Sequence, residues 1–215
     1  TITSQGGATR HGIYVDNGDS VIISNNILES INLNSAGTGI TLVNIQGDVE
    51  VDGNTIEMYK TRGIHARCES SDWRFTNNTI RDIEQTGIYV EKTGGVFTNN
   101  EINGVVAGDG INLTSSNSVV TENRFLSIQA GTGIIVNGGD NLVGNNFVEA
   151  EGVGIAKGIS LQANGSGSQI VFNSVNITGT DVANGVALEV LGGENYTVKN
   201  NILANNGGGY ASYFA

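Results

Sequence analysis

Apolar and polar residues alternate along this chain in short bursts that recur at a regular distance. One burst reads Gly-apolar-x-apolar, and apolar residues two positions apart place their side chains on the same face of a strand. Each copy therefore predicts a short strand with one buried face, entered through a tight corner at its glycine. The eight copies begin at Gly12, Gly39, Gly63, Gly87, Gly110, Gly133, Gly158 and Gly185.

Each repeat contains a second burst, Asn-x-apolar, with a further apolar residue three positions before the asparagine. Those further residues are all β-branched or aromatic, which favours strand. They are Ile23, Val51, Phe75, Phe97, Val120, Val143, Ile170 and Val198. The asparagines are Asn26, Asn54, Asn78, Asn100, Asn123, Asn146, Asn173 and Asn201, spaced 22 to 28 residues apart. A repeat of this length is typical of a solenoid, here with three short strands per turn.

The pattern predicts an all-β fold, a parallel β-helix of eight or nine rungs stacked about 4.8 Å apart in a rod roughly 40 Å long. A leucine-rich repeat would need a Leu-x-x-Leu-x-Leu consensus, and the 32 glycines oppose a helical array. We expect the repeated asparagine amides to bond to one another from rung to rung, forming an Asn ladder. The residue before each asparagine, which is Asn or Gly on six of the eight rungs, is expected at positive φ.

The Gly-Ile-x-Val and Asn-Asn-x-Ile pattern resembles the right-handed parallel β-helix, or pectate-lyase-like, superfamily over nearly the whole chain. That superfamily includes polysaccharide lyases, glycoside hydrolases, epimerases, phage tailspikes and surface proteins without catalysis. The run from Val198 to Tyr210 is similar to β-helix arrays in large secreted bacterial surface proteins. The resemblance implies a bacterial module that is extracellular or at the cell surface.

Residues 1–215 are predicted to form one β-helix domain that is a segment of a longer multidomain protein. The reason is that solenoids normally end in polar caps, whereas residues 209–215 form an apolar, strand-like run. We therefore expect flanking domains of the same protein. A processed or separately capped domain is the alternative.

The formal net charge of −11 disfavours nucleic acid and anionic membrane surfaces as partners through bulk charge. No apolar stretch approaches the length of a membrane-spanning helix, so we expect no membrane insertion. The single cysteine, Cys68, excludes an internal disulfide framework. We expect Cys68 to be a small buried residue, and Trp73 to belong to the core.

Substrates of β-helix enzymes lie along an outer strand face, so the resemblance directs attention to the outward positions of the Gly-block strands. These positions carry aromatic and charged side chains in the N-terminal half, and we expect the C-terminal half to be bland. The first outward row is Tyr14, Thr41, His65, Tyr89, Asn112, Ile135, Ser160 and Ala187. The second is Asp16, Val43, Arg67, Glu91, Thr114, Asn137, Gln162 and Glu189.

Residues 57–92 hold six of the ten lysines and arginines, and only there does this acidic chain gather enough positive charge to seat a uronate or sulfate. β-Elimination or C5 epimerisation would need a carboxylate neutraliser, such as Arg62 or Arg67, and a base and acid, such as His65 and Tyr89. The candidate catalytic residues are His65, Tyr89 and Arg67. The candidate substrate-binding residues are Lys60, Arg62, Tyr14, Glu91 and Asn112. The competing interpretation is a surface ion pair between Arg67 and Glu91 on adjacent rungs.

Other chemistry is weakly indicated, and no cofactor is expected. The carboxylate pairs Asp16/Asp19 and Glu149/Glu151 fit ordinary solvated turns better than a hydrolase site. His11 and His65 lie two rungs apart with no cysteine partner, which disfavours zinc. Calcium could bind the acidic residues 48–52, but alternation there points the carboxylates to water.

Three functions remain open from the sequence. The first is a module that interacts with polysaccharide. The second is a polysaccharide lyase or epimerase centred on His65, Arg67 and Tyr89. The third is a structural spacer or adhesin stalk.

Overall fold

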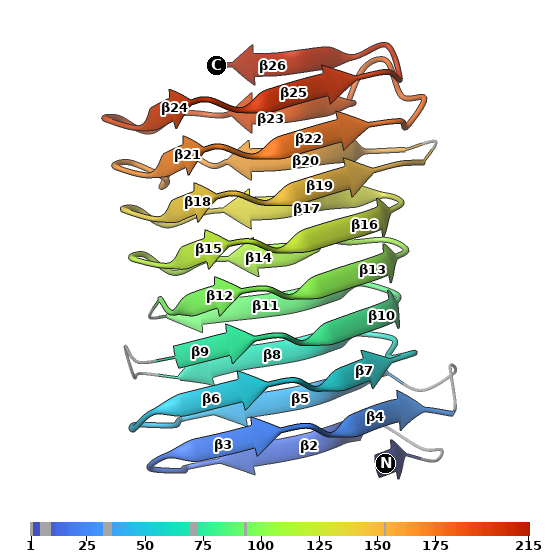
Figure 1. Ribbon diagram of the computed structural model, residues 1–215, viewed down its shortest axis with the longest axis vertical. Coiled ribbons are helices and arrows are strands. Elements are labelled where there is room, and N and C mark those ends of the chain that lie inside the picture. Colours follow the sequence, from blue (N-terminus) through green and yellow to red (C-terminus); the bar gives the residue numbers. More distant parts are fainter. Residues whose placement is uncertain (1, 5–9, 32–35, 69–72, 93, 153) are drawn as a thin grey trace.

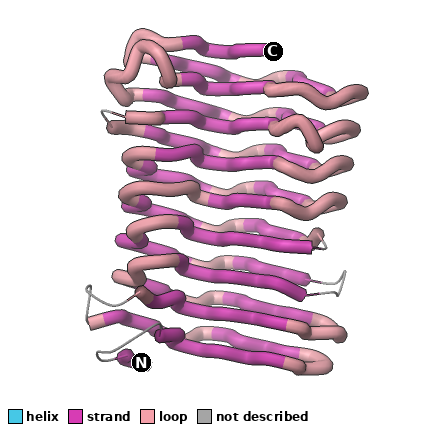
Figure 2. Tube along the Cα trace, turned by 180° about the vertical axis from the view of Figure 1, so that it is seen from behind, coloured by secondary structure: helices cyan, strands magenta, loops and turns pink. Residues whose placement is uncertain are grey.

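The computed structural model describes residues 2–4, 10–31, 36–68, 73–92, 94–152 and 154–215. Over these ranges the chain winds as a β-solenoid with three strands per rung, and each strand pairs in parallel with its counterpart on the next rung (Figure 1). The described residues contain strands, turns and bends but no helix. Seen from behind, the strands of successive rungs run side by side and the loops gather at the two lateral edges (Figure 2). The predicted parallel β-helix is therefore confirmed.

Three sheets run the length of the rod. The first comprises β1 (Ile2–Ser4), β4 (Ile27–Ser30), β7 (Thr55–Glu57), β10 (Thr79–Ile83), β13 (Glu101–Val105), β16 (Arg124–Ile128), β19 (Phe147–Ala150), β22 (Ser174–Ile177) and β25 (Ile202–Asn205). The second comprises β2 (Arg10–Asp16), β5 (Gly37–Val43), β8 (Arg62–Cys68), β11 (Thr86–Lys92), β14 (Ile111–Leu113), β17 (Gly131–Val136), β20 (Ala156–Leu161), β23 (Val186–Val190) and β26 (Tyr210–Phe214). The third comprises β3 (Val21–Ser24), β6 (Val49–Asp52), β9 (Trp73–Thr76), β12 (Val96–Thr98), β15 (Val119–Thr121), β18 (Leu142–Gly144), β21 (Gln169–Val171) and β24 (Thr197–Lys199).

The inward side chains of the three sheets form one continuous core. Like stacks on like, because parallel pairing, in register apart from a shift between Phe125 and Ile128 where β16 meets β19, brings equivalent residues together on neighbouring rungs. Phe75 and Phe97 stack with ring centroids 5.0 Å apart, and Trp73 meets Phe75 edge-on at 6.1 Å. Trp73 is buried, as predicted. The side chain of Cys68 lies outside the described part of the structure, so its predicted burial stays a prediction.

The Asn ladder is present along the corner between the third and first sheets. Each asparagine before the last, Asn201, donates its side-chain N–H to the Oδ1 of the next, as from Asn78 to Asn100 at 3.0 Å and from Asn100 to Asn123 at 2.9 Å. The same amide nitrogen also donates to a backbone carbonyl of the previous rung, as from Asn100 to Phe75 at 2.8 Å. The six ladder asparagines between Asn26 and Asn201 are almost completely buried, and these bonds satisfy their amides, which explains why no other residue type occupies the position.

The residue before each ladder asparagine adopts positive φ on all eight rungs. Asn and Gly tolerate this left-handed region, and they account for six of the eight positions. The two remaining residues, Glu122 at φ 61° and Phe172 at φ 58°, adopt it as well. The corner geometry is therefore imposed by the stack, even on side chains that disfavour it.

The repeated glycines do not form tight corners, and that expectation is wrong. Gly12, Gly39 and Gly63 lie inside strands β2, β5 and β8, with no positive φ. A Cβ on Gly39 would lie 2.6 Å from the carbonyl oxygen of Gly63 and 2.3 Å from a methyl group of Ile56. Glycine is needed because neighbouring rungs approach too closely for a side chain.

Candidate functional site

The outward side of the second sheet, here called the outer face, presents its side chains in columns that run from rung to rung. Strand pairing fixes the middle column, which passes in register through all nine strands. Its members are Tyr14, Thr41, His65, Tyr89, Asn112, Ile135, Ser160, Glu189 and Tyr213. The column agrees with the first predicted row as far as Ser160.

The predicted row fails on the eighth rung. Ser160 pairs with Glu189, and Gly158 lies against the carbonyl oxygen of Ala187. Ala187, expected in the first outward row, is instead fully buried at the glycine position, and Glu189 moves from the second row to the middle column. The reason is that a shift of two residues preserves the alternation of a strand, so the pattern alone does not detect it.

Five side chains on β8 and β11 converge on the outer face, and we call them the His65 cluster: Arg62, His65, Arg67, Tyr89 and Glu91. The Arg62 guanidinium lies over the Tyr89 ring, with its carbon 4.4 Å from the ring centroid. The His65 and Tyr89 rings are 5.5 Å apart. Glu91 lies between His65 and Arg67, with Oε1 3.1 Å from His65 Nε2 and Oε2 3.5 Å from Arg67 Nε. Adjacent parallel strands in register produce this convergence, because His65 pairs with Tyr89 and Arg67 with Glu91.

The protonation state of His65 follows from its surroundings. Burial lowers its pKa below the ordinary 6.5, and the positive charges of Arg62 and Arg67 lower it further, against the opposing hydrogen bond and charge of Glu91. A neutral imidazole donates Nε2–H to Glu91 and keeps Nδ1 as an acceptor. Arg62 Nη1 lies 3.5 Å from that Nδ1. Both ring nitrogens therefore face partners, and His65 holds Arg62 and Glu91 in place.

Comparison with known families agrees with the geometry. A family model described as the right handed beta helix region matches residues 1–148 and 62–214. The chain belongs to the right-handed β-helix family. This confirms the resemblance to the pectate-lyase-like superfamily. No curated protein and no solved structure gives a significant match to the chain.

The remaining predicted substrate-binding residues of this β-helix are only partly brought together with the cluster. Asn112 follows Tyr89 in the middle column and extends the cluster by one rung. Tyr14 lies two rungs before His65, where its hydroxyl donates to Asp16 at 3.3 Å and its ring lies 5.0 Å from that of His11. Lys60 is elsewhere. It pairs with Glu84 at 3.7 Å and lines a corner pocket of about 530 Å³ with Tyr59 and Val106.

Asp109 is a member of the outer face that the sequence analysis missed. Its carboxylate accepts hydrogen bonds from Asn112 Nδ2 at 2.9 Å and from the Thr132 backbone N–H at 3.2 Å. Burial raises its pKa above the ordinary value, and these two bonds oppose the rise. Asp109 stands three residues before the middle column, on the far side of the close-packed glycine. Inspecting the position three residues before the middle column on every rung would have identified Asp109.

Among the described residues, the side chains considered for metal binding do not form a site. Asp48, Glu50 and Asp52 alternate with the buried Val49 and Val51, as predicted. No group of three or more His, Cys, Asp or Glu side chains is arranged to hold a metal ion among the described residues.

The carboxylates considered for hydrolysis have ordinary surroundings. Asp16 accepts a hydrogen bond from Asn44 Nδ2 at 3.1 Å, and both Asp16 and Asp19 are exposed. Glu149 and Glu151 are partly buried on either side of Ala150, at the end of β19. Among the residues that the structure describes, no helix is long and apolar enough to cross a membrane.

Proposed function

We propose that the outer face of this β-helix binds an acidic polysaccharide at the His65 cluster. The observation that carries the proposal is the convergence of two guanidinium groups and one carboxylate around a neutral imidazole. These charges sum to about +1 on a chain whose formal net charge is −11. A uronate or sulfate group is the ligand chemistry that two arginine forks recognise.

The shape of the surface supports a polymer as the ligand. The middle column continues in register beyond the cluster in both directions, so an extended chain can contact several rungs at once. Tyr89 presents an amphipathic ring, and its stacking with Arg62 fixes the guanidinium plane while leaving its N–H edges for the ligand. Asn112 adds an amide, although Asp109 already holds its nitrogen.

The arrangement favours binding over catalysis. A general base needs a ring nitrogen that faces the proton it removes. In the His65 cluster, Glu91 occupies Nε2 and Arg62 approaches Nδ1, so His65 acts on its neighbours. An extracellular location within a larger protein is part of the proposal, and it rests on the similarity to secreted β-helix arrays.

The test is the affinity for polygalacturonate, alginate and an uncharged glucan, measured for wild type and Arg62→Ala. We expect the acidic polymers to bind, with affinity that falls as salt is added, and Arg62→Ala to weaken them about tenfold or more. Arg124→Ala is the matched control, because Arg124 forms a comparable cross-rung pair with Glu101 at 3.0 Å on the first sheet. Equal loss in both variants, or no binding by wild type, overturns the proposal.

A second candidate, a polysaccharide lyase, is favoured by the lowered pKa of His65 beside Tyr89. In that reaction a neutral His65, once Arg62 has moved to the substrate carboxylate, accepts the C5 proton, and Tyr89 protonates the leaving oxygen. The ultraviolet absorbance of unsaturated uronate products decides between the two candidates. Product formation that His65→Ala abolishes, with binding retained, replaces the binding proposal with catalysis.

A further inference from the structure

The C-terminal end of the outer face holds a second polar site, and the function above does not use it. Glu189 occupies the middle column between Ser160 and Tyr213. A pocket of about 300 Å³ opens beside it, here called the Tyr213 pocket. Its lining includes Lys157, Asn184, Val186, Glu189, Tyr210 and Tyr213. This end of the face is therefore not bland, contrary to the expectation from sequence.

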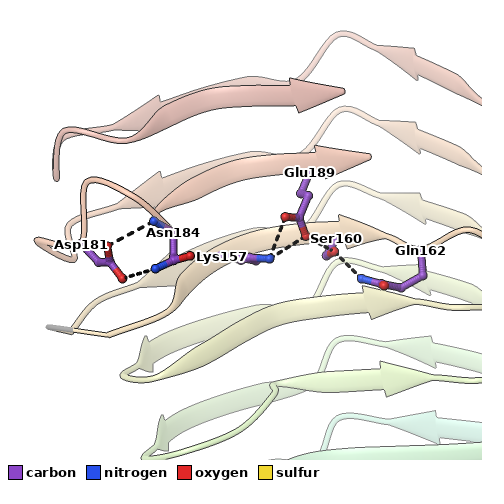
Figure 3. Close-up of polar contacts among 6 residues, drawn as sticks. All are labelled: Lys157, Ser160, Gln162, Asp181, Asn184 and Glu189. Atoms are coloured by element: carbon purple, nitrogen blue, oxygen red, sulfur yellow. Dashed lines mark hydrogen bonds and ion pairs between the residues drawn. The ribbon is translucent and has the colours of Figure 1, made fainter. Parts of the chain in front are cut away.

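The floor of the Tyr213 pocket is a largely buried ion pair, in which the Lys157 side chain is 21% exposed. Lys157 Nζ donates to both carboxylate oxygens of Glu189, at 2.7 and 2.8 Å, and Ser160 Oγ donates to Oε2 at 2.7 Å. Gln162 Nε2 in turn donates to Ser160 Oγ at 2.6 Å, so four side chains form one connected network (Figure 3). The Glu189 side chain is only 8% exposed.

The fold does not require charges at this position. On the preceding rung the positions equivalent to Lys157 and Ser160 hold Thr132 and Ile135. Burying an ion pair carries a desolvation cost that apolar side chains of similar size avoid. A costly pair that opens into a pocket, and that the repeat does not need, points to a ligand.

The walls of the pocket carry two aromatic rings and one side-chain amide. Tyr210 and Tyr213 lie with ring centroids 5.9 Å apart, and both rings are exposed. Asn184 also lines the pocket, and Asp181 holds it by accepting the backbone N–H groups of Ala183 and Asn184, at 2.9 and 3.2 Å, and the Asn184 side-chain nitrogen at 2.8 Å. These bonds set the Asn184 carbonyl oxygen as an acceptor beside the pocket. Figure 3 shows this pair next to the ion-pair network.

The chemistry of the floor selects the ligand. Lys157 and Glu189 sum to no net charge, so the pocket offers no charge for an ion to complement. The ammonium retains a third N–H beyond its two bonds to Glu189, and the carboxylate retains acceptor capacity. A donor and an acceptor side by side match two adjacent hydroxyl groups, and tyrosine rings match the apolar face of a sugar. We propose that the Tyr213 pocket binds an uncharged sugar ring through two neighbouring hydroxyls.

This site is separate from the His65 cluster, and the proposal does not depend on the function proposed there. The probes are methyl α-glycosides of glucose, galactose and mannose, and methyl glucuronoside, titrated by saturation-transfer NMR. We expect at least one uncharged glycoside to bind with a Kd on the order of 1 mM, and the uronoside to bind more weakly. Tyr213→Ala should weaken binding about threefold to tenfold, because it removes the exposed stacking ring.

Two controls keep the test specific. Phe147→Ala removes an aromatic residue of matched exposure, 40% against 41% for Tyr213, from the first sheet, and should leave the affinity unchanged. Arg62→Ala should also leave it unchanged, which separates this site from the His65 cluster. Glu189→Gln should abolish binding, but it leaves Lys157 unpaired and can destabilise the fold. Absence of binding by all three uncharged glycosides, tighter binding of the uronoside, or an unchanged affinity in folded Tyr213→Ala overturns the proposal.

Discussion

At the scale of single residues, the ladder asparagines hold several backbone and side-chain groups at once. Asn100 donates to Asn123 and to the Phe75 carbonyl, and it accepts two hydrogen bonds from Asn78. Asn100→Ala leaves these buried partners unsatisfied, so we expect it to lower the free energy of unfolding by about 1–3 kcal/mol. Urea denaturation measures this loss. Asn99→Gly is the control, because Asn99 is exposed at φ 60° and its replacement should change stability by less than about 0.5 kcal/mol.

The lowered pKa of His65 has a consequence for stability against pH. The unfolded chain binds a proton at His65 near 6.5, whereas the folded protein binds it only at lower pH. The contribution of neutral His65 to the free energy of unfolding is therefore complete above the pKa of the unfolded chain, and it is lost as the pH falls through the pKa of the folded protein. We expect the free energy of unfolding to fall more steeply below about pH 6.5 in wild type than in His65→Gln. NMR titration of the His65 ring gives the pKa directly, and a value above 6.5 contradicts the argument.

At the scale of elements, neighbouring rungs approach so closely at the repeated glycine that a side chain there should destabilise the fold. A Cβ on Gly158 would lie 2.2 Å from a Val175 methyl group and 2.4 Å from the Ala187 carbonyl oxygen. Gly158→Ala should therefore cost about 1–3 kcal/mol or more. Gly154 has nothing within 4 Å of the same built atom, so Gly154→Ala should be neutral or stabilise by up to about 1 kcal/mol. Similar melting temperatures for the two variants would contradict this account of the glycine column.

The corner at Phe172 tests the positive-φ column. Phe172 holds φ 58° while 56% exposed, so its ring contributes little burial against the strain of its backbone. Phe172→Asn retains the hydrogen bond from the backbone N–H to the Lys199 carbonyl. It also puts at this position a residue that tolerates the left-handed backbone conformation. We expect a gain of about 1 kcal/mol in the free energy of unfolding. A loss in urea denaturation would show that the exposed ring stabilises the corner after all.

At the scale of the whole molecule, the sequence predicts what the rungs share, and it misses what one rung does alone. Stacking multiplies each shared feature eightfold, so the strands, the core and the ladder were predictable. The His65 cluster was also predictable, because it lies on rungs whose alternation is unbroken. Glu189 was misplaced because an even shift keeps the pattern, and only the pairing of Ser160 with Glu189 reveals it. Asp109 and Lys157 were missed because they stand three residues before the middle column, outside the period of two. Arg62 stands at the same offset and was found only because positive charge gathers in residues 57–92.

The two proposed sites lie on one column, and this placement predicts how a long ligand behaves. His65 is on the third rung of the outer face and Glu189 on the eighth, so about 24 Å separates them at about 4.8 Å per rung. A polymer with both acidic and uncharged units can engage both sites, and the second contact then forms at a high effective concentration. We expect such a polymer to bind far more tightly than fragments too short to span the gap.

Calorimetric titration of a length series checks this expectation. For long chains, Arg62→Ala and Tyr213→Ala should each remove most of the gain, because one contact alone gives only fragment affinity, and the double variant should bind more weakly than a fragment, because neither contact remains intact. For short chains, each variant should affect only the ligand of its own site. If affinity does not increase once the chain is long enough to span the gap, and each single variant leaves long chains close to wild-type affinity, the two sites act separately.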